Sequence, residues 1–185
     1  MPQLTPEEIR RRFQTSSEFN ETFDAFEQAL EQRIDDMELY RQLFWNPSLA
    51  PHELCLFGEK LAKEFPHVAY ETFMWLANVF EVTYSMIDNH ELALEYYKKA
   101  ASVHPDILDP YLAAADCFEP DLNIPPLGVL IEFLKRGVEH ISEPKILYRR
   151  LAEFYDMNGN DEMSGYYRRL AQESGTPDQD PPAVE

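Results

Sequence analysis

The sequence predicts an all-α protein of antiparallel helices, and three observations support this prediction. The fourteen prolines cluster at a few points and leave long proline-free stretches between them. Proline breaks helix interiors, because it lacks an N–H and its ring clashes with the carbonyl four residues back. Apolar residues within these stretches recur at intervals of three and four, and no segment alternates with the period of two that indicates a strand.

The N-terminal helices are predicted from a cap signal and from apolar spacing. The run Thr5–Glu8 combines a cap residue, a proline in the first helical position and two acidic residues, so we expect a short helix within residues 1–17. Residues 18–66 should contain one long helix, capped by Ser17, followed by a degenerate helical pair whose second helix runs from Leu54 to Phe65.

Two later proline-free stretches should each divide into two helices. Asp88-Asn89 would separate the two helices of the stretch 67–104, and Asn158-Gly159-Asn160 the two helices of the stretch 145–176, because these residue types favour turns. Residues 174–185 lack apolar periodicity and contain no basic residue, so we expect a disordered acidic tail there.

Residues 67–173 contain a repeated pattern. The segments that begin at Ala77, Tyr111 and Tyr148 align with offsets of 34 residues (77 to 111) and then 37 (111 to 148). The helices that follow align with the reverse order of offsets, at Ala93, Leu130 and Ser164. A three-residue insertion in the irregular run Glu119–Pro126 explains both orders. The aligned rings of Tyr84, Phe118 and Tyr155 should therefore occupy equivalent positions.

This register resembles the tetratricopeptide repeat (TPR) family, whose unit is a 34-residue pair of antiparallel helices. The segment Ala93–Pro105 matches the family pattern of small, aromatic and small residues with a terminal proline. Ala77 and Glu81 depart from it, since a bulky aromatic and a small residue are usual there. The resemblance covers about Met74 to Gln172. It implies three TPR-like repeats stacked into a right-handed superhelix of antiparallel helix pairs.

The resemblance also implies a peptide-binding groove lined by the first helix of each pair. The groove positions would be Trp75, Asn78, Val82, Met86, Leu112, Asp116, Ile146, Arg149 and Glu153. Such a face, apolar with acidic borders, suits a partner's extended peptide or amphipathic helix that carries basic residues. Trp75 is the best candidate anchor, although it could equally pack against the preceding helix. Leu39 and Leu43 would extend the surface.

These features favour a protein-binding adaptor or scaffold and leave two alternatives. One is a chaperone similar to the helical-repeat chaperones of bacterial secretion systems, which share this chain's size and acidity. The other is a self-associating subunit that forms a homodimer through the last helix. Repeat arrays usually end in a polar capping helix, and no such helix is expected to cover the outer side of this one. The family's carboxylate clamp is not expected, because only Asn78 and Arg149 match it and the nearby acids Glu81, Asp116 and Glu153 would repel an acidic tail.

Composition and motifs disfavour other functions. Sixteen basic against 34 acidic residues give a net charge of −18, which disfavours nucleic acid and anionic membranes as partners. No stretch approaches the roughly 18 apolar residues of a membrane span, and the two cysteines form no disulfide framework, so we expect a cytoplasmic protein. His52 and Cys55 are too few for a metal site, and no catalytic motif occurs. We therefore expect no cofactor, no metal and no enzymatic activity.

Overall fold

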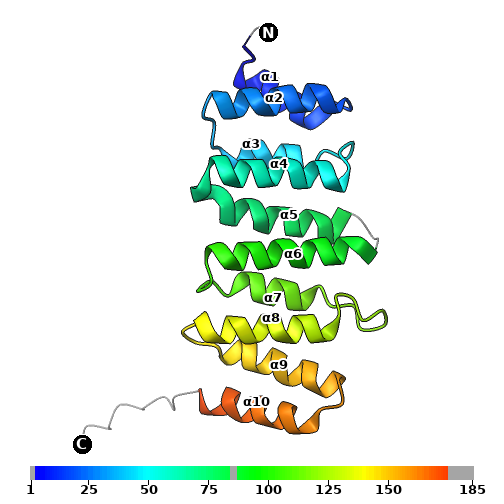
Figure 1. Cartoon of the computed structure of the whole chain (residues 1–185), viewed down its shortest axis with the longest axis vertical. Coiled ribbons are helices and arrows are strands. Elements are labelled where there is room, and N and C mark those ends of the chain that lie inside the picture. The colour runs from blue at the N-terminus through cyan, green and yellow to red at the C-terminus, as the bar shows by residue number, and fades with distance from the viewer. Residues whose placement is uncertain (1–2, 84–86, 175–185) are drawn as a thin grey trace, which may run out of the picture. The chain divides into compact units, whose positions relative to one another are not determined.

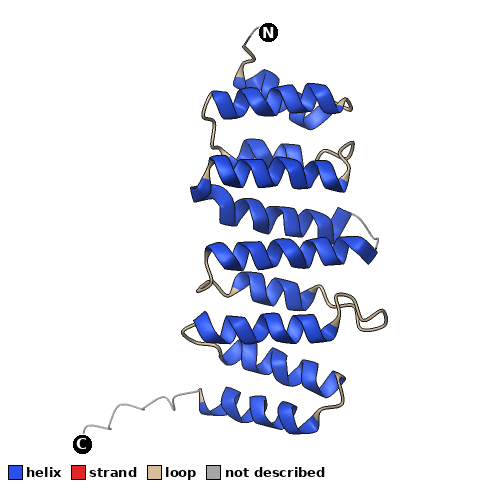
Figure 2. Cartoon of the chain, in the orientation of Figure 1, coloured by secondary structure: helices blue, strands red, loops and turns tan. Residues whose placement is uncertain are grey.

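The computed structural model describes residues 3–83 and 87–174, and its regular structure is helical (Figures 1 and 2). The described helices are α1 (Pro6–Thr15), α2 (Phe19–Glu31), α3 (Met37–Phe44), α4 (Pro51–Glu64), the 3-10 turn η1 (Pro66–Val68), α5 (Ala69–Thr83), α6 (Ile87–Val103), α7 (Asp109–Asp116), α8 (Leu127–His140), α9 (Lys145–Met157) and α10 (Asp161–Glu173). Within the described ranges no strand forms, and the only bridge joins Glu119 to Ile124. None of these helices combines the length and apolarity needed to cross a bilayer. The all-α prediction is confirmed.

The chain forms two compact units, unit 1 (Met1–His104) and unit 2 (Pro105–Glu185). In unit 1, α1 packs on α2 and α3, α3 packs on α5, α4 packs on α2 and α5, and α5 packs on α6. In unit 2, α7 packs on α8 and α9, α8 packs on α9, and α9 packs on α10. In each unit, the packed pairs therefore join helices that are one or two positions apart in chain order. The boundary at His104 falls inside the segment 67–173 that we expected to form one array.

Residues 18–46 do not form the single long helix that the apolar spacing predicted. The helix α2 ends at Glu31 and α3 begins at Met37. Between them Arg33 adopts a left-handed backbone conformation with φ 57°, and Asp36 caps α3 by accepting a hydrogen bond from the backbone N–H of Glu38 at 3.0 Å. The break is hidden in the sequence because the three-and-four spacing of apolar residues continues through the turn. This correction makes α2 the partner of α1 and leaves α3 to precede α4.

Two helix starts also differ from prediction. The N-cap residue of α2 is Glu18 rather than Ser17, and the hydroxyl of Ser16 accepts a hydrogen bond from the Glu18 backbone N–H at 3.2 Å. Because α6 begins at Ile87, Asp88 and Asn89 belong to its first turn and do not separate α5 from α6.

Other local signals are confirmed. Thr5 and Glu8 form a capping box at the start of α1, in which Glu8 accepts from the Thr5 backbone N–H at 2.8 Å. The turn between α9 and α10 uses Gly159 with φ 70°, a conformation that glycine adopts without strain, and Asn160 caps α10. The expected loop after α7 is present, with its ends joined by a hydrogen bond from Glu119 N to Ile124 O at 2.7 Å.

Small residues allow the helices of unit 2 to approach closely. Gly137 of α8 faces Tyr111 of α7 and Leu147 of α9, and a Cβ at Gly137 would lie 2.8 and 2.9 Å from their ring and methyl carbons. The positions that align with Gly137 in the repeat, Ala100 and Ala171, are also buried, at 0% and 6% exposure. The predicted repeat register therefore matches the burial of its small residues.

The aromatic part of the repeat prediction fails in unit 2. Phe118 follows the end of α7 and packs on Phe154, with 5.5 Å between ring centroids, whereas Tyr155 lies within α9 and stacks on Tyr167 at 5.6 Å. The surroundings differ because α7 ends before the aligned position and α9 continues through it. Tyr84 lies outside the described residues.

Candidate protein-binding surface

Both tryptophans of the chain lie together on α3 and α5 of unit 1. Trp45, the C-cap residue that follows α3, is 46% exposed, and its ring lies edge-on to the half-buried Trp75 ring at 6.2 Å between centroids. The guanidinium of Arg41 lies over the Trp75 ring, 4.7 Å from its centroid. Trp75 therefore packs against residues of α3, and Trp45 presents the more accessible ring.

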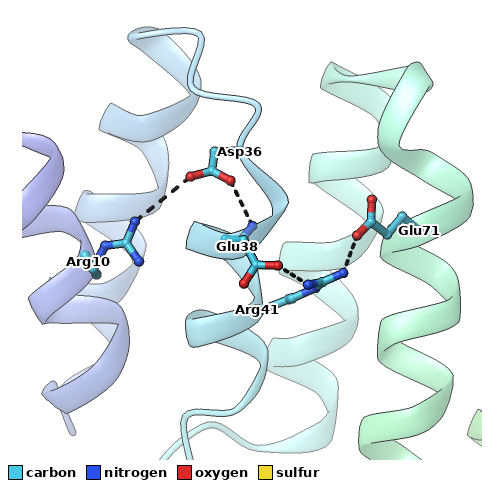
Figure 3. A network of polar contacts seen from close by, with 5 residues as sticks. All are labelled: Arg10, Asp36, Glu38, Arg41 and Glu71. Carbon is cyan, nitrogen blue, oxygen red and sulfur yellow. Dashed lines mark hydrogen bonds and ion pairs between the residues drawn. The ribbon is translucent and has the colours of Figure 1, made fainter.

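Arg41 also connects the two helices electrostatically (Figure 3). Its guanidinium forms ion pairs with Glu38 in α3 and with Glu71 in α5, the latter at 2.5 Å. Towards α1, Arg10 forms a 4.0 Å ion pair with Asp36 at the start of α3. Charged contacts thus join α1, α3 and α5 side by side. Because Glu38 and Glu71 share one guanidinium, their part of the surface keeps a net negative charge.

Two buried donors at this surface have no hydrogen-bond partner within the described residues. They are Nε of Arg41 and Nε1 of Trp75. The side chain of Arg41 is 29% exposed overall, so its two terminal nitrogens reach carboxylates while Nε is covered. The Trp75 N–H makes no hydrogen bond within the described residues. The ring is therefore held by the cation–π contact with Arg41 and by the aromatic contact with Trp45.

The remaining predicted groove positions of unit 1 have different roles. Asn78 is held by its own helix pair, because its side-chain oxygen accepts a hydrogen bond from the Tyr97 hydroxyl at 2.9 Å. The Tyr97 hydroxyl also lies 2.8 Å from a Glu81 oxygen. Val82 is 65% exposed and lies on the same face of α5 as Trp75, seven residues later. Met86 lies outside the described residues.

The predicted positions of unit 2 gather on α7 and α9. Arg150 of α9 forms ion pairs with Asp116 of α7 and, at 3.2 Å, with Glu153 one turn along α9. The acids predicted to border a groove are therefore both bound by one arginine. Leu112 is half-buried and Ile146 is 41% exposed, so this face also carries accessible apolar surface.

Arg149 lies next to Arg150 in sequence but has a different environment. It is exposed and forms no ion pair with a carboxylate of the described residues. Together with Lys145 it lines two neighbouring cavities along α9 and α10. Carboxylates of the described residues thus neutralise Arg150 but not Arg149.

Sequence reasoning missed Trp45, Arg41 and Arg150. It placed Leu39 and Leu43 on the surface, but their side chains are 2% and 0% exposed and belong to the core. The helix α3 is buried on more than one face, since Met37, Tyr40 and Phe44 are buried as well. Both contacts join residues that lie 30 positions apart in the sequence, since Trp45 contacts Trp75 and Arg41 contacts Glu71, and this offset becomes visible only once α3 is aligned on α5.

His52 and Cys55 lie one turn apart on α4, and within the described residues they belong to no larger group of potential metal ligands. His52 is exposed and Cys55 is half-buried on α4. Desolvation raises the pKa of the Cys55 thiol, which disfavours the thiolate form. Among residues 3–83 and 87–174, no group of three or more His, Cys, Asp or Glu side chains could hold a metal ion.

Comparison with known proteins identifies the fold. No protein-family model matches the sequence, and no curated protein matches it. A crystal structure of the MamA protein matches with a TM-score of 0.51 and 15% identity, covering 91% of this chain and 89% of that chain. A second crystal structure of MamA matches with a TM-score of 0.50 and 15% identity, covering 84% and 88%. The chain therefore has a TPR-like helical-repeat fold of antiparallel helix pairs, as its sequence predicted.

Proposed function

We propose that the chain is a protein-binding adaptor or scaffold that captures a partner's peptide or amphipathic helix on the face formed by α3 and α5. The observation that carries this proposal is the exposed ring of Trp45, which rests on a Trp75 ring held in place by Arg41. Large aromatic side chains on a rigid support dominate the binding energy of many protein interfaces. Val82 extends the apolar surface along α5.

The charge of this face favours a basic partner. Glu38 and Glu71 share the single guanidinium of Arg41, so one negative charge remains beside the tryptophans. The chain as a whole carries 34 acidic against 16 basic residues and would attract a basic segment over a longer range. A bound segment with apolar residues and adjacent lysine or arginine would place its apolar side chains on Trp45 and its cations near Glu38 and Glu71.

In unit 2, we propose that Leu112 and Ile146 supply a further apolar contact for a partner. The ion pairs of Arg150 with Asp116 and Glu153 would fix the charged groups around them. Such a fixed border contributes specificity more than affinity, since exposed ion pairs contribute on the order of 0.2–1 kcal/mol each.

The test is a synthetic peptide array probed with the purified protein. The array carries amphipathic sequences with an apolar stripe flanked by lysine, and each sequence has a matched version with glutamate in place of lysine. We expect binding to the lysine series. Trp45→Ala should weaken that binding by more than about tenfold, as for an aromatic hot spot worth on the order of 2 kcal/mol.

The matched control is Leu56→Ala, which removes a side chain of nearly equal exposure from α4 of the same unit. Leu56 is 44% exposed and Trp45 is 46% exposed. We expect the control to bind as the wild type does. Equal affinity of the Trp45→Ala, Leu56→Ala and wild-type proteins for every bound peptide would refute the assignment of this face.

A further inference from the structure

Unit 2 contains a cationic surface in an otherwise acidic chain. One cavity of about 560 Å³ between α9 and α10 is lined by Lys145, Arg149 and Arg168, together with Glu153, Gln172 and two alanines. A neighbouring cavity of about 630 Å³ shares Lys145 and Arg149, and Glu143 is its one acidic lining residue. We call the surface formed by these two cavities the cationic surface.

Some charged side chains of this surface already have an ion-pair partner, and others do not. Glu153 is paired with Arg150, and Arg168 is paired with Asp156. Lys145 and Arg149 form no ion pair with any carboxylate of the described residues, and of the acids in the cavity lining only Glu143 is likewise unpaired. The unpaired charges therefore leave the surface positive.

The chain's own last residues have the complementary chemistry. Residues 175–185 contain Asp178, Asp180 and Glu185, no basic residue, and the apolar run Pro181–Val184. Apolar side chains also line the second cavity, among them Ile141 and Ile146. The other 174 residues retain 31 acids (34 less these three) against 16 bases, so most of the protein surface would repel this segment.

Where the segment starts favours the same surface. Ser174, the residue before it, itself lines the second cavity. Eleven residues reach up to about 36 Å when extended, so Asp178 and Asp180 are well within range. A short tether also gives a local concentration on the order of millimolar, which allows weak ion pairs to hold.

We propose that residues 175–185 dock on the cationic surface of the same molecule, with Asp178 and Asp180 against Lys145 and Arg149. In this position the segment covers Ile146 and Arg149, two of the positions predicted for the groove. This proposal does not rest on the binding face of unit 1.

The experiment is carbodiimide crosslinking of the dilute full-length chain, with the crosslinked monomer isolated and its peptides mapped by mass spectrometry. This reagent joins an amine to a carboxylate that it already contacts. We expect Lys145 to be the main lysine joined to Asp178 or Asp180, ahead of Lys60, Lys63, Lys98, Lys99 and Lys135. About 0.5 M salt should reduce the yield, since the contacts are exposed to solvent.

Charge reversal provides the matched comparison and keeps both reacting groups. Arg149→Glu should lower the Lys145 crosslink about tenfold, through one lost attraction and one new repulsion. Arg136→Glu makes the same charge change at an exposed residue of α8 that has no ion pair within the described part of the chain, and it should leave the yield unchanged. Circular dichroism confirms that both variants are folded. Crosslinks spread evenly over the lysines, crosslinks found only in a dimer, or equal effects of the two variants would each overturn the proposal.

Discussion

Replacing Gly137 with alanine places a methyl group where α8 meets α7 and α9. The new Cβ would lie 2.8 Å from Cδ1 of Tyr111 and 2.9 Å from Cδ1 of Leu147, well inside the roughly 3.5–4.0 Å of an ordinary carbon contact. Tyr111 is 2% exposed and Leu147 is fully buried, so neither side chain can turn into solvent. We therefore expect Gly137→Ala to force the helices apart.

The size of the effect follows from two opposed contributions. Overpacking a core costs about 1–3 kcal/mol, whereas alanine improves helix propensity over glycine by up to about 1 kcal/mol. The net expectation is a loss of about 1–2 kcal/mol in the free energy of unfolding. The matched control is Gly165→Ala in α10, where nothing lies within 4 Å of an added Cβ. It should gain about 0.5–1 kcal/mol from propensity alone.

The assay is urea unfolding followed by circular dichroism. The midpoint should move to lower urea for Gly137→Ala and to higher urea for Gly165→Ala. Leu147→Val in the Gly137→Ala background should recover part of the loss, because it removes one of the clashing methyl groups. A Gly137→Ala protein as stable as Gly165→Ala would refute the close approach of α8 to α7 and α9.

Three further expectations concern other elements. Thr5→Ala should cost about 1 kcal/mol of α1 stability. Hydrogen bonds from the Thr5 backbone and side chain lower the pKa of Glu8, so the capping box should stabilise α1 above the ordinary carboxyl pKa and lose this effect as pH falls through the lowered pKa. A pH titration of helicity in wild type and variant would show this difference, and a variant with the same acid profile as the wild type would contradict it. Arg41→Ala should destabilise unit 1 by about 1–2 kcal/mol and alter tryptophan emission, because it removes two ion pairs and the cation over Trp75; unchanged emission would argue against that contact. If the chain forms a homodimer through α10, the 44% exposed Tyr166 lies in the contact between the two copies. Light scattering over a dilution series should then detect a dimer that Tyr166→Glu abolishes. A monomer at every concentration would exclude this dimer.

Local sequence signals predicted the features that local chemistry determines. The capping box at Thr5 and the turn at Gly159 involve residues within three positions of one another, so their chemistry is visible in a short segment. The repeat spacing similarly identified the buried small residues of the second helices, because those positions must be small for pairs to pack. The break before α3 was missed, since the left-handed conformation of Arg33 has no strong residue signal and the apolar spacing is continuous.

The binding face was predicted only in part, because it depends on how distant helices align. Trp75 and Val82 could be assigned from the register of α5 alone. The contact of Trp45 with Trp75 depends on how α3 packs along α5, and no residue near Trp45 specifies that alignment. The packing of α9 on α7 similarly decides that Arg150, and not its neighbour Arg149, forms the ion pair with Asp116.

The most direct test of the binding face is tryptophan emission during titration with a lysine-series peptide that binds. The chain's two tryptophans both lie on this face, with 6.2 Å between their rings, so emission reports the α3–α5 surface without a label. We expect a saturable shift of the emission to shorter wavelength, as the exposed Trp45 ring is covered, and loss of most of that shift in Trp45→Phe. Saturable peptide binding with no change in emission would contradict the assignment, because the partner would then be held elsewhere.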